Sequence, residues 1–462
     1  MGVLCRGKWR NKHCPVVCLI VFLAMMSGSG PAGAVGETLT FGANVRLRYE
    51  FQDNFNQLFY GQNPAKGSTS DGFLLGRLRA GFDYTPSGQF HLALWLQDAE
   101  AWDLALADSD FFKAKFDQEN NPNKDRWELW DSYLEIKNLF DVPLSVKAGR
   151  QRIFYGDKRV FGPGEWGNSG RWIWDAVKLS CRFSHGFVDA YYGRTQLHDP
   201  HEFSLNHRHG FESAGIYSRF ESPAKRVPIV LEPFIMTRVD GHDRYKGEDQ
   251  AMGDLDSWYW GFRAFQKDLC GFEYDFTYIR QDGDYADDDI KAWGYHALLG
   301  YTFKRVTLEP RISLEYSYAS GDNDPADGDH ETFDAAFGAR DKMYGRMNLF
   351  QWQNLKDAQA NFEIRPLTWL YLKAEYHQFR LAEREDAWYL NAQAYRDKSG
   401  QSGDEVGREL DIVAVINLFP NHCIQTGFGH FRPDEFARAV ASDKNSNWVF
   451  VQWEYKLSWK ML

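Results

Sequence analysis

The stretch "TLEPRISLEYSY", residues 307–318, alternates apolar and polar side chains with a period of two. Leucine, proline, isoleucine and tyrosine occupy the even positions, whereas threonine, glutamate, arginine and serine occupy the odd ones. Successive side chains of a β-strand point to opposite faces of a sheet. The stretch therefore predicts a strand that separates an apolar medium from water.

The same alternation recurs along the chain in about 18 segments, each roughly 10–14 residues long, which is the length a tilted strand needs to cross a bilayer. They lie near residues 39–51, 73–84, 88–98, 127–137, 143–155, 174–184, 187–195, 210–220, 227–238, 256–267, 270–281, 290–303, 306–319, 354–365, 368–380, 406–418, 421–431 and 446–459. A soluble β-sandwich or β-solenoid could alternate similarly, but strands of globular proteins average about 5–6 residues. The pattern predicts an all-β fold, a transmembrane antiparallel β-barrel of about 18 strands.

The connections between these segments alternate in length. Short turns such as "TPSG" (85–88) and "KR" (304–305) alternate with long polar stretches such as 241–254, 321–334 and 383–406. Outer-membrane barrels have short periplasmic turns and long extracellular loops. We therefore predict one barrel domain over residues 35–462, with acid-rich stretches such as 282–289 in its outer loops.

The first 34 residues have the composition of an export signal. Arg6, Lys8, Arg10 and Lys12 precede the apolar run at 15–26, and Ala-Gly-Ala follows at 32–34. Basic, apolar and small-residue segments in this order are typical of a signal peptide, and the apolar run is too short to span a bilayer. Residues 1–34 are predicted to be a signal peptide, and the outer membrane is the predicted location.

Charge and cysteine usage exclude other classes. The formal net charge of −11 disfavours a nucleic-acid partner. After the predicted signal peptide only Cys181, Cys270 and Cys423 remain, widely spaced and without a C-x-x-C motif. We predict neither a disulfide framework nor a metal site nor a cofactor.

The polar strand faces would line a lumen wide enough for water, and arginine recurs on them. The predicted lumen cations are Arg46, Arg48, Arg77, Arg79, Arg150, Arg152, Arg171, Arg182, Arg311 and Lys373. Charged rings select ions by sign, and a guanidinium binds carboxylates through two parallel hydrogen bonds. Alternatively, these cations pair with lumen acids and brace the barrel. The predicted acidic partners are Asp83, Asp131, Glu135, Glu309 and Glu315.

One histidine-rich stretch, "LHDPHEFSLNHRHG" (197–210), has residue types that could bind metal. It contains His198, His201, His207 and His209, with Asp199 and Glu202 between them. Histidines clustered in an outer loop are more often solvated than bound to metal, so no metal site is predicted. The sequence contains neither G-x-S-x-G nor H-E-x-x-H, and no enzyme is predicted, although an outer-membrane enzyme remains a third class.

A longer block carries a family resemblance. "AGRQRIFYGDKRVFGPGEWGNSGRWIWDAVKL" (148–179), with "LWDSYLEIKN" (129–138), "GRELDIVAVIN" (407–417) and "GFGHFRPDEF" (427–436), resembles the alginate-export family of outer-membrane porins. The resemblance implies a monomeric barrel of about 18 strands whose arginine-rich lumen passes a polyuronate outward. It assigns lumen roles to Arg150, Arg152 and Arg171. The 156–170 part is closer to the broad family than to the dedicated alginate exporter, so the polymer need not be alginate.

The sequence thus predicts an anion-selective outer-membrane channel for an acidic polysaccharide, such as an alginate-like polyuronate, or for another anionic solute. A small-solute uptake porin is the alternative. Expected partners are outer-membrane lipid, lipopolysaccharide and the anionic solute, and a periplasmic export scaffold is left open. The sequence also leaves open which solute passes and whether it is exported or taken up. It does not decide whether a loop plugs the pore or whether the acidic outer loops bind divalent cations.

Overall fold

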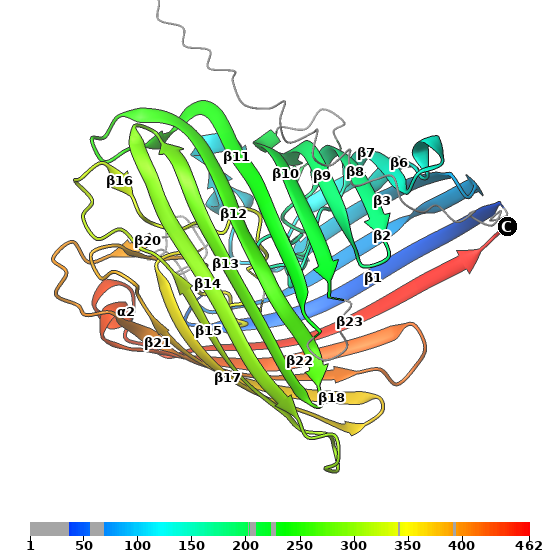
Figure 1. Ribbon diagram of the computed structural model, residues 1–462. Coiled ribbons are helices and arrows are strands. Elements are labelled where there is room, and N and C mark those ends of the chain that lie inside the picture. Colours follow the sequence, from blue (N-terminus) through cyan, green and yellow to red (C-terminus); the bar gives the residue numbers. More distant parts are fainter. Residues whose placement is uncertain are drawn as a thin grey trace, which may run out of the picture.

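The computed structural model describes residues 37–55, 69–201, 203, 209–222, 228–340, 342–390 and 394–462. The predicted signal peptide, residues 1–34, lies outside them. The described chain forms a closed antiparallel barrel of 18 strands, which confirms the predicted fold (Figure 1). Its strands are β1 (Thr38–Asp53), β2 (Asp71–Ser87), β3 (Phe90–Trp102), β6 (Asp125–Ile136), β7 (Leu144–Gln151), β8 (Trp174–Phe183), β9 (Gly186–Gln196), β10 (His209–Glu221), β11 (Val230–Lys246), β12 (Met252–Leu269), β13 (Phe272–Tyr285), β14 (Asp288–Thr302), β15 (Arg311–Ala319), β17 (Leu355–Leu367), β18 (Leu370–Arg380), β21 (Glu405–Ile416), β22 (His422–Pro433) and β23 (Ser446–Lys460).

Each strand pairs with its neighbours in sequence, and the barrel closes where β1 pairs with β23. Short elements lie in the described connections: β4 (Phe112–Lys113), β5 (Gln118–Glu119), β16 (Asp329–His330), β19 (Ala387–Tyr389), β20 (Ala394–Arg396), α2 (Glu435–Val440) and the 3₁₀ turns Asp108–Phe111, Ala114–Phe116 and Leu139–Asp141. No helix in the described ranges is both long and apolar enough to cross a bilayer.

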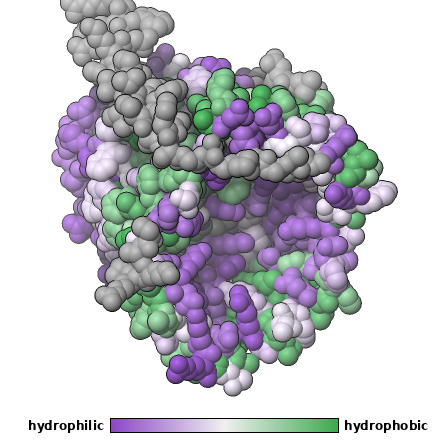
Figure 2. Space-filling model, turned by 45° about the vertical axis from the view of Figure 1, so that its right-hand side comes forward, coloured by the Kyte–Doolittle hydropathy of each residue, from purple (hydrophilic) through white to green (hydrophobic). Residues whose placement is uncertain are grey.

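The two faces of the barrel differ in polarity, as the alternation predicts. Large apolar side chains such as Leu314 and Ile412 are exposed on the outside, whereas polar side chains of the same strands, such as Ser313 and Asp411, are buried inside. Figure 2 shows a hollow lined by hydrophilic residues. An exposed apolar belt around a closed barrel is the surface that lipid covers.

The long connections all lie at one end of the barrel, and the connections at the other end are short. Short turns join β2 to β3, β8 to β9 and β12 to β13, and the end of β23 lies beside the start of β1 at this short-turn end (Figure 1). The long connections include 103–124, 152–173, 320–354 and 381–404 at the other end.

Two stretches predicted to be outer loops are mostly strand. β11 runs to Lys246 and β12 begins at Met252, while Ala286 and Asp287 alone join β13 to β14. The loop prediction was wrong for these two stretches because an acidic composition indicates contact with water. It does not indicate that the backbone is irregular. Strand pairing can continue beyond a bilayer, since the ladder satisfies the backbone while both faces meet solvent.

Two strand boundaries also differ from the prediction. β15 begins at Arg311 and not near residue 306, because Leu308 and Glu309 have positive φ angles of 74° and 42°, which a regular strand does not accommodate. Glu309 therefore lies exposed in the turn before β15 and not on the lumen face. β7 ends at Gln151, so Arg152 belongs to the connection that follows.

The 152–173 and 320–354 connections fold into the barrel, and we call them the first and second inward loops. Phe161 of the first loop forms a β-bridge with Phe337 of the second. The Phe337 ring also packs against Trp172 and Trp174, with centroids 5.5 and 4.6 Å apart. All of these rings are buried. The inward loops thus build an apolar core inside the lumen and narrow it.

Candidate functional site

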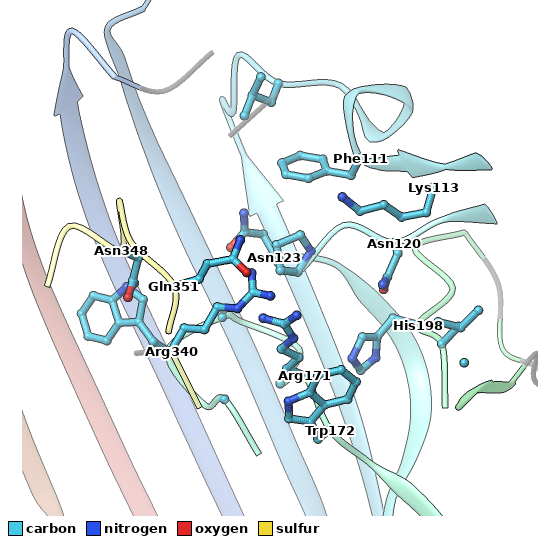
Figure 3. Close-up of a pocket in the computed structure, with 18 of the residues that line it drawn as sticks. Phe111, Lys113, Asn120, Asn123, Arg171, Trp172, His198, Arg340, Asn348 and Gln351 are labelled. Carbon is cyan, nitrogen blue, oxygen red and sulfur yellow. The ribbon is translucent and has the colours of Figure 1, made fainter. Parts of the chain in front are cut away.

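A cavity of about 280 Å³ lies inside the barrel, between the inward loops and the 103–124 connection (Figure 3). Cations dominate its polar lining. They are Arg48, Lys113, Arg171, Arg238, Arg340 and Arg346. Among the described lining residues, Glu50 is the one carboxylate, and it already pairs with Arg48 at 2.7 Å. Aromatic rings, including those of Phe111, Trp166 and Trp172, complete the walls.

Three of the cavity cations converge from different connections. Arg171 and Arg340 approach one another from the first and second inward loops, and Lys113 extends toward them from β4 (Figure 3). Burial, and next the charges of Arg340 and Arg171, lowers the pKa of Lys113 to about 8. A bound anion would offset this mutual repulsion, so the cavity is electrostatically suited to an anion.

The other cavity arginines have carboxylate partners at the wall. Arg238 on β11 pairs with Asp334 of the second inward loop at 2.7 Å. Arg346 pairs with Glu375 on β18. These pairs fix the second inward loop to the barrel and position its side of the cavity.

The predicted lumen arginines of β1 and β2 are all buried. Arg46 and Arg77 stand opposite one another in the strand register. Arg46 donates hydrogen bonds to the Glu165 carbonyl and to Asn168 Oδ1, both at 2.9 Å, and Arg77 donates one to Asn44 Oδ1 at 3.1 Å.

The remaining two arginines of this group stack on aromatic rings. The guanidinium of Arg48 lies 4.0 Å from the Trp166 ring centroid, and that of Arg79 lies 3.4 Å from the Trp130 ring centroid. Arg79 also donates a hydrogen bond to Gln97 Oε1 at 2.7 Å. The first inward loop thus rests on this arginine group.

The motif arginines of the quoted block are bound by acids. Arg150 pairs with Glu128 at 2.6 Å and with Asp175 at 2.7 Å. Arg152 pairs with Asp131 at 2.6 Å and with Glu165 at 2.8 Å. These contacts are those of the bracing alternative.

The other predicted cations occupy different places. Arg311 pairs with Glu273 and Glu363, and Lys373 pairs with Glu375 at 2.7 Å. Arg171 lines the cavity. Arg182, near the short-turn end of β8, is exposed and lies 5.2 Å from the Phe187 ring centroid.

Of the predicted acidic partners, Asp131 is the one that forms a salt bridge with a predicted lumen cation in the described part of the chain. Asp83 accepts a hydrogen bond from Trp95 and contacts His91, which also lies 3.6 Å from Glu135. Glu315 accepts a hydrogen bond from Asn361 at 2.7 Å. Glu309 lies in the turn described above.

Sequence reasoning missed Lys113, Arg238, Arg340 and Arg346 in the cavity lining. Three of these lie in connections or short elements without alternation, so no sequence signal was available for them. Arg238 could have been found, because it follows Phe234 and Met236 at a spacing of two on the buried face of β11.

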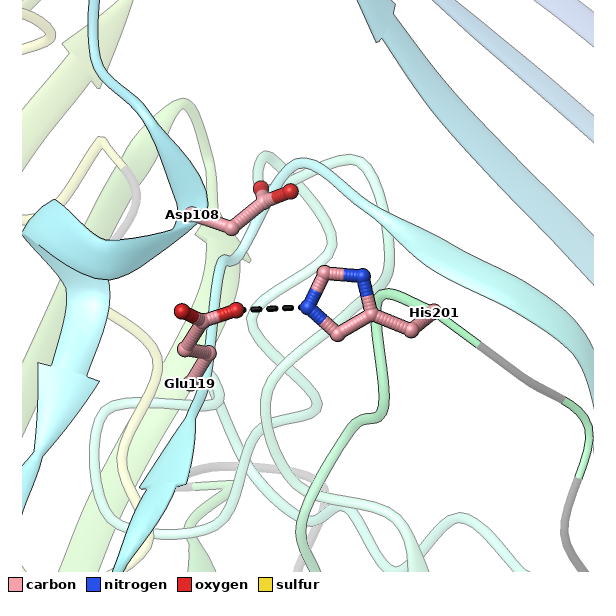
Figure 4. A group of neighbouring side chains, drawn as sticks. All are labelled: Asp108, Glu119 and His201. Carbon is pink, nitrogen blue, oxygen red and sulfur yellow. Dashed lines mark hydrogen bonds and ion pairs between the residues drawn. The ribbon is translucent and has the colours of Figure 1, made fainter.

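The histidine-rich stretch is divided by the structure. His198 lines the cavity and lies 3.0 Å from Asp125, His209 on β10 lies 3.1 Å from Asp175, and His207 lies outside the described residues. His201 meets Glu119 at 2.6 Å, with Asp108 nearby (Figure 4).

The group of Asp108, Glu119 and His201 could hold a metal ion, since one ligand atom from each lies within 4.8 Å of the others. Protein cations and donors already occupy its carboxylates, however. Lys124 lies 3.1 Å from Asp108, and Asn121 donates to it at 2.8 Å. These contacts form an ion-pair network that ties the 103–124 connection to the residues after β9.

Solved structures with the same fold include outer membrane proteins. The chain is similar to the outer membrane protein OprD from Pseudomonas aeruginosa, with 12% identity, a TM-score of 0.57, and coverage of 91% of this chain and 94% of that one. Acinetobacter baumannii OccAB2 has 13% identity and a TM-score of 0.57, with 91% and 98% covered. The outer membrane protein OpdK from Pseudomonas aeruginosa has 11% identity and a TM-score of 0.57, with 91% and 99% covered.

At these identities the likeness concerns the fold. A search of curated proteins finds no match. The family model described as alginate export matches residues 37–452, which is nearly the whole barrel. The chain is thus an outer-membrane β-barrel channel protein, and it belongs to the alginate export family.

Proposed function

We propose that this channel is anion-selective and passes carboxylate-bearing solutes without covalent chemistry. The observation that carries the proposal is the cavity lining, which contains six cations and, among its described residues, a single carboxylate. Fixed charges inside a pore select ions by sign, and guanidinium groups bind carboxylates directionally. An acidic polysaccharide, such as an alginate-like polyuronate, fits this lining because it presents carboxylates at regular intervals and sugar faces to the aromatic walls.

A small-solute porin is the second candidate, and one observation favours it. The inward loops leave a cavity of about 280 Å³, close to the lower limit of small-molecule sites, about 300 Å³. One neighbour of the same fold, OpdK from Pseudomonas aeruginosa, was crystallised with vanillate, a small carboxylate. A polymer would need the inward loops to move further than a monomer would.

Anion selectivity is tested by the reversal potential of the purified protein in a planar bilayer under a KCl gradient. We expect the wild type to favour chloride. In the double variant Lys113→Gln/Arg340→Gln, the ratio of chloride to potassium permeability should fall several-fold, because two converging cavity charges are removed. Lys304→Gln/Arg305→Gln removes two cations from the exposed turn before β15 and should leave selectivity unchanged. Cation selectivity of the wild type, or equal losses in both variants, would contradict the proposal.

The two candidate solutes differ in how they block the chloride current. If the path carries a polymer, an oligomer of uronic acids should block at a several-fold lower concentration than the monomer, because several carboxylates engage the lumen cations together. Equal potency per carboxylate would favour the small-solute porin. Adding the blocker to each side of the bilayer in turn tests the preferred direction of entry.

A further inference from the structure

We propose that Glu165 is an internal competitor for solute carboxylates. Its side chain occupies a carboxylate site formed by Arg77, Arg79 and Arg152, and the Gly164–Asn168 segment thereby closes the path between the cavity and the short-turn half of the lumen. An anionic solute opens the path by replacing Glu165 at these arginines. The inference rests on the proposed function and deepens it, since it identifies where solute and protein compete.

The contacts of Glu165 are those of a bound carboxylate. Its Oε1 atom lies 2.8 Å from Arg152 Nη1 and 3.7 Å from Arg79 Nη1. Burial alone would raise the pKa of Glu165, but Arg79, Arg152 and Arg77 together lower it to about 2. The group is therefore ionised at every physiological pH. The side chains of Glu165 and Arg152 remain 40% and 28% exposed, so a solute can reach the site from the Arg152 side.

The arginines have more donors than Glu165 can satisfy. In the described part of the chain, Arg77 Nε and Nη1 and Arg79 Nη2 are buried without a hydrogen-bond partner. Arg77 forms no salt bridge there, and only 6% of Arg77 and of Arg79 is exposed. Buried guanidinium donors without partners are costly, and a second carboxylate would satisfy them. A solute carboxylate that replaces Glu165 therefore gains donors that Glu165 leaves unused.

The position of the segment makes this competition a gate. Gly164, Trp166 and Gly167 line the cavity, whereas Glu165 between them turns away to the arginines. Arg48 lines the cavity, and two residues earlier on β1 Arg46 stands opposite Arg77. Because β1 runs from the short-turn end to the long-loop end, the arginine site lies on the short-turn side of the segment. A solute carboxylate leaving the cavity toward that end meets Glu165 next.

The test is the concentration at which glucuronate, a monomeric uronic acid, blocks the KCl current in a planar bilayer. Glu165→Gln keeps the shape of the side chain but removes the competing charge, so we expect glucuronate to bind about tenfold more tightly or better. Glu165→Asp keeps a carboxylate and should stay close to the wild type. Glu135→Gln is the matched control, because it removes a lumen carboxylate that lies beside His91 and Lys137 instead of these arginines.

The outcomes separate this inference from the proposed function. A higher conductance of Glu165→Gln without tighter block would mean that the segment merely loosens, and equal tightening in Glu135→Gln would mean a general field effect. Either result overturns the competitor role while anion selectivity stands. If the wild type preferred cations, and if glucuronate blocked neither the wild type nor any variant, the proposed function would be contradicted as well.

Discussion

Arg150→Ala is expected to lower the free energy of unfolding of the barrel by about 3–5 kcal/mol, the cost of removing one partner of a buried ion pair. Arg150 on β7 holds Glu128 on β6 and Asp175 on β8, so it connects three adjacent strands. Glu128 is 2% exposed and carries most of the expected loss. Asp175 is 36% exposed at its side chain and keeps its contact with His209, so it contributes little. Urea unfolding of the protein in lipid vesicles, followed by tryptophan fluorescence, measures the change.

Arg182→Ala is the matched control for this loss. Arg182 also lies on a barrel strand, but it is exposed and forms no ion pair within the described ranges. Its replacement should change the free energy of unfolding by less than about 0.5 kcal/mol. Equal destabilisation by the two variants would mean that Arg150 does not brace the wall, and it would favour a role for this motif arginine in contact with solute.

The barrel was predictable because the lipid–water boundary acts on every second residue of every strand. That boundary explains why residues 307–318 and their counterparts alternate, and why the strand count is right. It does not act beyond the bilayer, so the acidic hairpin of β13 and β14 was predicted to be a loop although its strands continue to Tyr285 and Asp288. The alternation also predicts that β15 begins near residue 306. The positive φ angles of Leu308 and Glu309 delay its start to Arg311.

The partners of the lumen cations were less predictable, since they depend on register and loop folding. Asp131 and Glu135 are predicted to face the lumen. If the strand alternated strictly, Glu128, three residues before Asp131, would face outward. A register shift between β3 and β6 gives β6 an extra residue between Leu129 and Ser132, which turns Glu128 inward to Arg150. Glu165 lies in a loop whose sequence has no period at all, and its place beside Arg152 depends on the packing of the first inward loop.

The inward loops themselves had no recognisable sequence signal. Their apolar residues, such as Phe161, Trp172 and Phe337, are not periodic, and in an outer-membrane barrel a long connection is expected to face the outside. They turn inward because these rings pack on one another and exclude water from the lumen. The cavity therefore arises from tertiary packing, which explains why only Arg48 and Arg171 of its cations were predicted.

Asn168→Ala is expected to raise the single-channel conductance several-fold. Asn168 is fully buried, and its Nδ2 atom donates to the carbonyl oxygens of Gly76 at 2.6 Å, Glu100 at 3.0 Å and Asn123 at 3.2 Å. Its Oδ1 atom accepts a hydrogen bond from Arg46. Alanine leaves these buried groups without partners, which costs roughly 2–3 kcal/mol locally and loosens the Gly164–Asn168 segment, which we propose closes the path.

Asn361→Ala separates loosening of the segment from loss of stability. Asn361 is 3% exposed and donates to Ser313 and Glu315 within the wall, so alanine there should cost similar stability while leaving conductance unchanged. Because Arg46 also binds the Glu165 carbonyl, the segment stays tethered in Asn168→Ala, and selectivity should survive while conductance rises. Unchanged conductance in Asn168→Ala would mean that this segment does not limit passage. The narrowest point would then lie at the second inward loop, which the Arg238–Asp334 and Arg346–Glu375 pairs hold to the wall.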